Sequence, residues 1–434
     1  MAVTLEHPKP DDRTRVNGDL SARAAAEAYT GGVCFKLGPP TLIGAELEWL
    51  SAYGATPPAR PLSAPRPPLT VLADALGPHA PRSITPDSPA LALPGGSRVT
   101  VEPGGQIELS SAPYPSAAEL CARLRADHDR LRDLLAARSI RLITAAADPE
   151  RRPRRLLRLP RYRAMERYFA GIGPFGKLMM CNTAATQVSV DTGADRAELT
   201  ARWRALYTVG PALLAAFACS PALRGAPVGN WASQRMRTWL RLDNARTRPP
   251  AADWADPVAG YARWALDAPL LCVRRPTPAR EAGECEWNAP PGATFADWIS
   301  GALDDEIGRR PDSDDLDYHL TTLFPPVRAS GHLEVRYVDA QPGNGWAVVV
   351  QVFEALMSTP AAVADAVSAA EPTAERWLDA ARHGLADPDL RASAVAVLEA
   401  AAAHTPATAS RIHAAIRRCR AGTAPGDEES DERT

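Results

Sequence analysis

Lysine is nearly absent from this sequence of 434 residues, which contains only Lys9, Lys36 and Lys177. The 49 basic residues are therefore almost all arginine, whose planar guanidinium binds carboxylate and phosphate groups through paired hydrogen bonds. An excess of positive charge is missing as well, since the formal net charge is -2. The chain thus lacks the bulk field that draws basic proteins to nucleic acid or to an anionic membrane.

Paired cysteines and long apolar runs are also missing. The 7 cysteines are odd in number and no two form a CxxC pair, which disfavours a secreted disulfide scaffold. Residues 1–30 carry scattered charges without the apolar core of a signal peptide. No uncharged apolar stretch approaches the ~20 residues that a membrane-spanning helix needs. We therefore expect a cytoplasmic monomer that acts on small molecules and contacts neither nucleic acid nor membrane.

The order of predicted elements favours an α+β fold with an antiparallel sheet. Strand-like alternation occurs at 33–49, 97–102, 106–111, 177–191 and 331–338, and helical patterns at 196–217, 231–241 and 256–269. Ser116 followed by Glu119 predicts the start of a further helix that ends near Ala137. Because strands and helices do not alternate strictly, a doubly wound sheet is disfavoured.

The chain divides into four parts on composition. Residues 1–30 form a mobile arm that leads into a short helix, and residues 31–345 form the main domain, in which proline-rich 55–68 is a loop. Residues 346–420 are Ala-rich and predicted helical. The charged tail at 421–434 is predicted to be disordered.

Alternate glutamates mark the first candidate site. Glu46 and Glu48, in GAELEWL, lie two apart on a predicted strand and so point to the same face. Adjacent carboxylates repel each other, and their burial is unfavourable unless a cation or arginine neutralises them. A solvent-exposed strand with alternate acids would look the same, so this motif alone leaves both interpretations open.

Further strands carry acidic residues in a similar arrangement. Glu102 and Glu108 flank a glycine turn in TVEPGGQIELSSAP, and HLEVRYVDA places Glu334 and Arg336 on one face of a strand. Carboxylates from several strands on one side of a sheet predict a Mg²⁺ site that also binds nucleotide phosphates. Together the three segments favour the metal site over a set of exposed hairpins.

A partial P-loop motif occurs at 171–178 (GIGPFGKL), which matches seven positions of GxxxxGK[ST]. The eighth position is Leu178, which cannot bind Mg²⁺ as Ser or Thr would, and the preceding RYRAMERYFA does not resemble a buried strand. We therefore interpret the segment as a glycine-rich turn before the next strand. The sequence also contains no HExxH, GxSxG or zinc-spaced Cys/His set, which disfavours hydrolases and zinc enzymes.

Taken together, these segments resemble the glutamate–cysteine ligases of the plant and proteobacterial type. The similarity lies in GAELEW, EPGGQIELSSAP, RYRAMERYF, MMCNTAATQVSVD, SPALRG with SQRMRTW, and YHLTTLFPPVRASGHLEVRYVDA. It extends over roughly residues 40–345, in order. The resemblance implies a glutamine-synthetase-like fold in which a curved antiparallel sheet, flanked by helices, forms a funnel for ATP, Mg²⁺ and L-glutamate.

The same resemblance implies the reaction and the roles of individual residues. The activity is ATP-dependent ligation of L-glutamate to L-cysteine through γ-glutamyl phosphate, with 31–345 as the catalytic domain. Overall similarity points to the actinobacterial branch, which supplies γ-glutamylcysteine for ergothioneine. The expected metal ligands are Glu46, Glu48, Glu102, Glu108 and Glu334. The expected catalytic residues are Glu48, Arg235 and Arg336, and the expected substrate- or nucleotide-binding residues are Gln187, Arg235, Arg336, Thr321 and Thr322.

Three positions depart from the family pattern. Asn182 stands where plant-like members carry Arg, Cys219 where many carry Asn, and Pro326 where an acidic residue is usual. These departures leave open a ligase that uses a different amine. A non-catalytic nucleotide- or amino-acid-binding module on the same scaffold is a further alternative, although such a module has no reason to keep so many like charges together.

Overall fold

The computed structural model describes residues 20, 22–248, 255–275, 286–405 and 409–426. The strands are β1 (Ile43–Tyr53), β2 (Arg98–Val101), β3 (Ile107–Ser110), β4 (Ile140–Ile143), β5 (Ala185–Val190), β6 (Val327–Ala329) and β7 (Leu333–Asp339). The helices of the first half are α1 (Arg23–Cys34), α2 (Leu69–Leu76), α3 (Ala117–Ala136), α4 (Pro160–Ala170), α5 (Phe175–Asn182), α6 (Arg196–Thr208) and α7 (Gly210–Phe217). Those that follow are α8 (Gln234–Leu240), α9 (Asn244–Thr247), α10 (Pro257–Asp267), α11 (Phe295–Ser300), α12 (Asp304–Ile307), α13 (Ser313–Leu320), α14 (Trp346–Leu356), α15 (Pro360–Ala370), α16 (Trp377–His383), α17 (Pro388–Ala403) and α18 (Ala409–Arg420).

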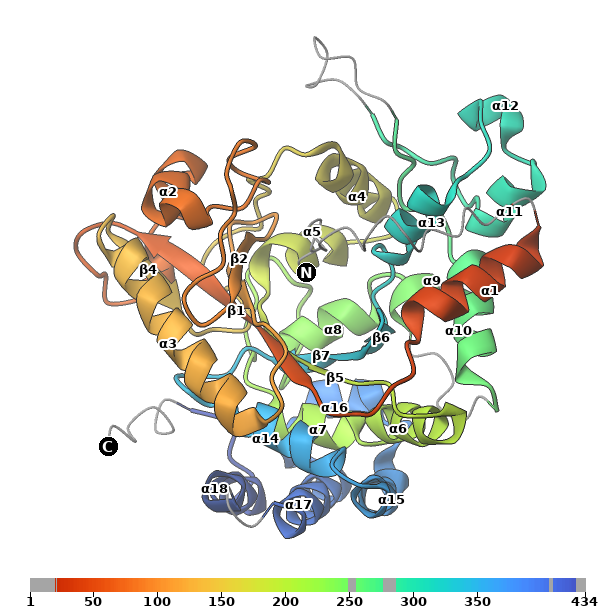
Figure 1. The fold of residues 1–434 in the computed structure, drawn as a ribbon. Helices are drawn as coiled ribbons and strands as arrows, with labels where there is room; N and C mark the ends of the chain where they lie inside the picture. The colour runs from red at the N-terminus through yellow and green to blue at the C-terminus, as the bar shows by residue number, and fades with distance from the viewer. Residues whose placement is uncertain (1–19, 21, 249–254, 276–285, 406–408, 427–434) are drawn as a thin grey trace.

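An antiparallel sheet lies at the centre of the molecule, in the order β2-β3-β1-β5-β7-β6, with β4 paired to the end of β1 (Figure 1). Every pairing is antiparallel, as the α+β prediction requires. Strands distant in the chain thereby become neighbours, since β1 lies between β3 and β5. The motifs that the sequence places on β1, β3, β5 and β7 therefore share one sheet.

Helices cover the apolar face of this sheet. Side chains at alternate positions, such as Leu47 on β1, Val188 on β5 and Val335 on β7, are buried in the main core. Each such burial contributes roughly 1.5–3 kcal/mol to folding. Helix α14 contacts β1 and β5, and α7 contacts β7. The opposite face of the same strands carries the acidic residues, as the period of two predicts.

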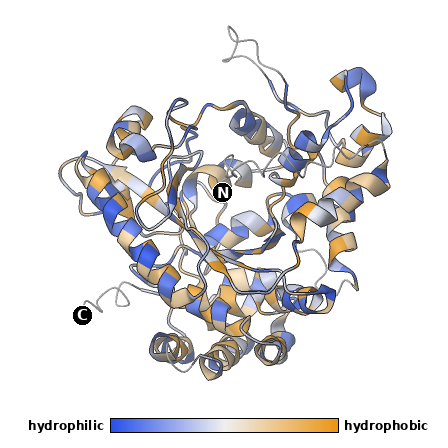
Figure 2. Ribbon diagram, in the orientation of Figure 1, coloured by the Kyte–Doolittle hydropathy of each residue, from blue (hydrophilic) through white to orange (hydrophobic). Residues whose placement is uncertain are grey.

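The Ala-rich C-terminal helices form a further layer outside α7 and α14. Helix α17 contacts α7, α14, α15 and α18, and Figure 1 shows α15, α17 and α18 at the lower edge of the molecule. Figure 2 shows that α3 alternates hydrophilic and hydrophobic residues along its length, as expected for a helix with one solvent-facing side. Asp387 caps the start of α17 through its side chain.

The predicted strand at 177–191 is wrong over its first part. Helix α5 occupies Phe175–Asn182, and β5 begins only at Ala185. The glycine turn before α5 follows helix α4 rather than a strand, so the structure excludes a P-loop here. Leu178 is buried, and the ammonium of Lys177 pairs with Glu166 at 2.5 Å.

Two other predicted elements differ in extent. The helix predicted at 196–217 is divided into α6 and α7, because Pro211 lies in the first turn of α7 and lacks an amide hydrogen for a continuous helix. The strand predicted at 33–49 begins only at Ile43, since α1 extends to Cys34 and residues 38–40 (GPP) interrupt regular structure.

Among the described residues, Cys34, Cys121, Cys181 and Cys272 are free thiols, and Cys285 lies outside this part of the chain. Within the same residues no single helix is long and apolar enough to cross a membrane. Only α14 taken together with 360–373 meets the length and composition criteria, and that pair is bent by 112°.

Candidate active site

The carboxylates of β1 and β3 lie on the sheet face opposite α14. Glu48 pairs with Glu108 across the β1–β3 ladder, and Glu46 pairs with Gln187 across the β1–β5 ladder. The side chains of Glu48 and Glu108 are buried, and that of Glu46 is half-buried. The structure therefore brings these acids together on one face, away from water.

Neutral donors hold these carboxylates in place. The Gln187 amide donates to Oε2 of Glu46 at 3.1 Å and to Oε1 of Glu48 at 3.2 Å. The Ser110 hydroxyl donates to Oε1 of Glu46 at 3.2 Å and to Oε1 of Glu108 at 3.0 Å. Such hydrogen bonds orient the oxygens but bring no positive charge to balance them.

Burial and mutual repulsion change the acidity of this cluster. Burial raises the pKa of Glu46 well above its usual range, and the charges of Glu108 and Glu334 raise it further. Burial also raises the pKa of Glu108, and it raises the pKa of Glu102 to about 7. A cation bound among these carboxylates would lower their pKa values and favour the ionised forms.

Glu102 reaches the cluster from the turn between β2 and β3. Its backbone amide donates to the Gln106 carbonyl at 2.9 Å, which closes the turn. Gly104 approaches helix α5 so closely that an added Cβ would lie 2.3 Å from the Cys181 carbonyl oxygen. Only glycine fits there, so the turn holds Glu102 against α5.

An arginine pair occupies the neighbouring strands β6 and β7. Arg328 donates to Oε2 of Glu334 through Nε at 3.0 Å and Nη2 at 2.6 Å, and Arg336 donates to the other oxygen, Oε1. Burial alone would raise the pKa of Glu334, but the two guanidinium groups outweigh it and lower that pKa to about 2. Glu334 is therefore an ionised residue that orients two arginines. Arg328 was not among the predicted site residues, although VRAS and LEVR form adjacent strands that place Arg328 opposite Glu334.

A β-bulge brings a further acid to the site face. The register of β5 against β7 shifts by one residue at Gln187, which lies opposite both Arg336 and Tyr337. A bulge reverses which of the following side chains face the site. Asp339, three residues beyond Arg336, consequently lies on the same side as Arg336.

Asp339 connects β7 to the segment that carries Arg235. Its carboxylate accepts the Ser220 hydroxyl at 2.7 Å, the Ser233 hydroxyl at 2.9 Å and the Cys219 amide at 3.0 Å. The buried Arg235 guanidinium lies 3.9 Å from Asp339 and donates to the carbonyl of Arg336 at 2.7 Å. Sequence reasoning missed Asp339, because a regular strand would have directed it to the apolar face.

Replacing Asp339 by asparagine is expected to lower the free energy of unfolding by about 2–4 kcal/mol, since the amide NH₂ would face a donor and Arg235 would lose its nearest counter-charge. Urea unfolding measures this change. Asp256→Asn is the matched control, because Asp256 is an exposed N-cap of α10 and asparagine caps a helix about as well, so this change should cost less than about 0.5 kcal/mol. Equal losses in both variants would contradict the connecting role of Asp339.

The predicted threonines lie at the end of α13 and their hydroxyls have partners there. The Thr321 hydroxyl donates to the Tyr318 carbonyl at 2.6 Å and accepts from Arg161 at 3.0 Å. The Thr322 hydroxyl donates to the His319 carbonyl at 2.7 Å and is buried. These contacts terminate the helix, so the structure supplies a local structural role for both residues.

The departures from the family pattern have defined surroundings. Asn182 accepts a hydrogen bond from Arg66 at 2.8 Å, and Arg66 belongs to the proline-rich loop 55–68. A guanidinium from that loop therefore lies beside the position where plant-like relatives carry Arg. The carbonyl of Pro326 accepts from the Arg336 amide at 2.9 Å, a contact that does not depend on the side chain at 326.

The donor set suits a hard cation bound together with a ligand. Among the described residues, no group of three or more His, Cys, Asp or Glu side chains converges closely enough to hold a metal ion unaided. Mg²⁺ does not require such a group, because it usually takes one or two carboxylates and completes its octahedron with phosphate oxygens and water. The carboxylate oxygens of Glu46, Glu48 and Glu108, which lie together on one face of the sheet, fit that demand.

Comparison with known proteins decides the family. The model of the family described as "glutamate-cysteine ligase family 2" (GCS2) matches residues 42–430. The chain belongs to this family. It is 37% identical over 406 residues to the glutamate–cysteine ligase EgtA of Mycolicibacterium smegmatis, a match that covers 92% of this chain and 88% of the relative. It is 36% identical over 436 residues to EgtA of Mycobacterium tuberculosis, covering 99% and 94% respectively.

A solved structure shares the fold of this family member. The glutamate–cysteine ligase of Francisella tularensis, solved in complex with AMP, aligns with a TM-score of 0.52 at 13% sequence identity. The alignment covers 91% of this chain and 84% of that chain. This likeness confirms the predicted α+β fold class.

Proposed function

We propose that this family member uses ATP and Mg²⁺ to join the side-chain carboxylate of L-glutamate to the amine of L-cysteine, and that it makes γ-glutamylcysteine for ergothioneine. The observation that carries the proposal is the buried carboxylate face of β1 and β3 beside the arginines of β6 and β7. The names of the mycobacterial relatives support the choice of cysteine and of the pathway. A substrate set that includes ATP agrees with the cytoplasmic location expected from the sequence.

The acidic residues of the site, by holding Mg²⁺, and its arginines would each help to neutralise the negative charge of the substrates. ATP and glutamate are both anions, so phosphoryl transfer needs positive charge around the reacting oxygens. One or two of Glu46, Glu48, Glu102 and Glu108 would hold each Mg²⁺, which when bound neutralises charge on the phosphates. Arg336 would bind a carboxylate or phosphate directly, because its fork geometry fixes the orientation of planar anions.

The role of Glu334 changes in this proposal. Sequence similarity assigned it to the metal, but two arginines already neutralise its carboxylate. We therefore assign to Glu334 the role of orienting Arg328 and Arg336. The candidate metal ligands are then the acidic residues of β1, of the β2–β3 turn and of β3. Arg235 is buried behind Arg336 and supports it through the backbone carbonyl.

In the second step the cysteine amine attacks the γ-glutamyl phosphate and expels phosphate. A ligase of this fold that accepts another amine would use the same first step, and only the amine-binding residues would differ. The test is to incubate the protein with ATP, Mg²⁺ and glutamate, vary the amine, and measure ADP release and product mass. Glutamate-dependent release that responds to cysteine supports the proposal, and its absence with every amine would favour a binding module.

Stability of the metal-free protein should fall as the pH rises from about 4.5 to about 7. The folded pKa of Glu102, about 7, exceeds the usual 4.5, so the folded state binds the proton more tightly and loses this advantage when the proton leaves. The full effect of this shift is on the order of 3 kcal/mol. Thermal melts across this range measure it, and ATP with Mg²⁺ should stabilise more at pH 8 than at pH 6.

Glu102→Gln is the control for this titration, because an amide does not ionise. The melting temperature of the variant should depend less steeply on pH than that of the wild type, while the fold is kept. An identical dependence in both proteins would show that Glu102 does not contribute.

A further inference from the structure

Trp239 of helix α8 contacts both of the buried arginines that lie behind and beside the acidic cluster. It follows Arg235 by four residues, so the two side chains share one face of the helix. That face is turned toward β7, where the backbone carbonyl of Arg336 accepts a hydrogen bond from Arg235 at 2.7 Å. The centre of the Trp239 ring lies 5.9 Å from the guanidinium carbon of Arg235 and 5.5 Å from that of Arg336. The roles proposed above do not include this ring.

These contacts take place away from water. The exposed fraction is 8% for Trp239, 2% for Arg235 and 4% for Arg336. A cation over an aromatic face is attracted by the quadrupole of the ring, and the attraction is larger where both groups are desolvated. Phe324 packs edge-on against the same indole, with the ring centres 5.7 Å apart and the planes at 85°. The indole is therefore a rigid surface for both guanidinium groups.

The ion pair of Arg336 holds its guanidinium at one point. Only Nη1 donates to Glu334. The Nε atom is buried and has no acceptor within the part of the chain that the structure describes. A group held through one nitrogen can rotate about that contact, whereas a flat ring against its face removes this freedom. The orientation of the guanidinium plane thus depends on Trp239.

We propose that Trp239 is a positioning residue, which fixes the plane of the Arg336 guanidinium for an incoming carboxylate or phosphate. The inference rests on the proposed ligase function and on the anion-binding role given there to Arg336. Trp239 acts through Arg336 and does not have to touch the substrate. A guanidinium binds such anions through two parallel hydrogen bonds, and a rotated plane would lose one of the pair.

Two substitutions of Trp239 supply the first test. Trp239→Leu should lower kcat/KM by about 10- to 30-fold for the substrate, ATP or glutamate, whose kinetics respond to Arg336→Ala. The KM of the other substrate should change by less than about 2-fold. Trp239→Phe should stay within about 3-fold of the wild type, because it keeps an aromatic face. The indole N–H that it removes has no acceptor among the described residues.

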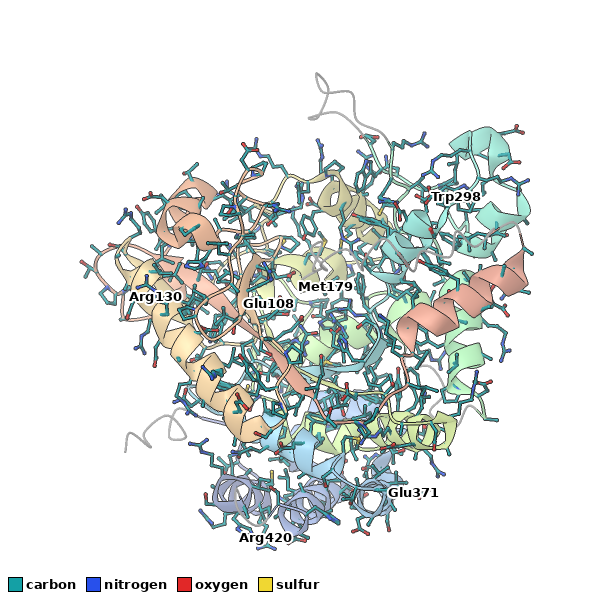
Figure 3. The ribbon with its side chains drawn as sticks, in the orientation of Figure 1. Glu108, Arg130, Met179, Trp298, Glu371 and Arg420 are labelled. Carbon is teal, nitrogen blue, oxygen red and sulfur yellow. The ribbon has the colours of Figure 1, made fainter. Side chains whose placement is uncertain are left out.

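Trp298→Leu is the matched control for the loss of a buried tryptophan. Trp298 is 2% exposed and also contacts an arginine, since the guanidinium carbon of Arg309 lies 4.9 Å from its ring centre. Figure 3 shows Trp298 at the edge of the molecule, well away from Glu108 of the acidic cluster. This variant should lower the melting temperature as Trp239→Leu does, but it should leave the KM values for ATP and glutamate unchanged.

The double variant Arg336→Ala/Trp239→Leu separates positioning from a structural role. Once the guanidinium is gone, the loss of the ring should reduce kcat/KM by less than about 2-fold beyond Arg336→Ala alone. A further 10-fold reduction in that background, or normal kinetics of Trp239→Leu, would overturn the inference while leaving the proposed function intact. Full activity of Arg336→Ala would instead refute the anion-binding role of Arg336, and the inference with it.

Discussion

Glu48→Gln is expected to abolish glutamate-dependent ADP formation, with a loss of at least about 10³-fold in kcat, while the protein stays folded. Glu48 lies at the centre of the acidic face, opposite Glu108, where Gln187 and the Ala185 amide at 2.9 Å hold its two oxygens. Glutamine keeps the shape of the side chain but removes the negative charge that a nucleotide-bound Mg²⁺ requires.

The stability of Glu48→Gln separates this effect from unfolding. The substitution removes one of several like charges from a buried cluster, so the melting temperature of the metal-free protein should not fall by more than a few degrees. Glu119→Gln is the matched control, because Glu119 lies exposed in the first turn of α3. Normal turnover by Glu48→Gln would remove the basis for the metal assignment.

Arg336→Ala is the second substitution with a large expected effect, a loss of at least about 10³-fold in kcat/KM for ATP or glutamate. The Arg336 guanidinium is buried, pairs with Glu334 and stacks over Trp239 at 5.5 Å from the ring centre. An arginine held this firmly is oriented before the substrate arrives. ADP release at varied ATP and glutamate concentrations measures the loss.

Arg336→Lys tests whether charge or geometry is required. Lysine keeps the positive charge but cannot make the paired hydrogen bonds of a guanidinium, so it should restore only a small part of the activity. Arg196→Ala, which removes an exposed arginine at the start of α6, should leave turnover unchanged. Full activity in Arg336→Ala would contradict a role for this residue in binding anions.

Periodicity predicted much of this fold, and it did so where strands are regular. Glu46 and Glu48 share a face because β1 alternates without interruption, and the glycine turn after Glu102 forms as its sequence indicates. The prediction failed at 177–182, where an apolar run between breakers suits a buried helix as well as a strand. The length of this run and its flanking residues did not distinguish a helix from a strand.

The remaining site residues depend on tertiary contacts that no local pattern carries. The β-bulge opposite Gln187 turns Asp339 toward the site, and nothing within HLEVRYVDA indicates a bulge. The pairing of β6 with β7 makes Glu334 a partner of arginines, although its sequence setting resembles that of the metal-binding glutamates.

Oxygen transfer from glutamate to phosphate tests the central claim most directly. The reaction is run with ATP, Mg²⁺, cysteine and glutamate labelled with ¹⁸O in its side-chain carboxylate, and the released phosphate is examined by mass spectrometry. Ligation through γ-glutamyl phosphate predicts one ¹⁸O atom in each phosphate, formed together with γ-glutamylcysteine. Unlabelled phosphate, or ATP cleavage that does not require glutamate, would contradict the account.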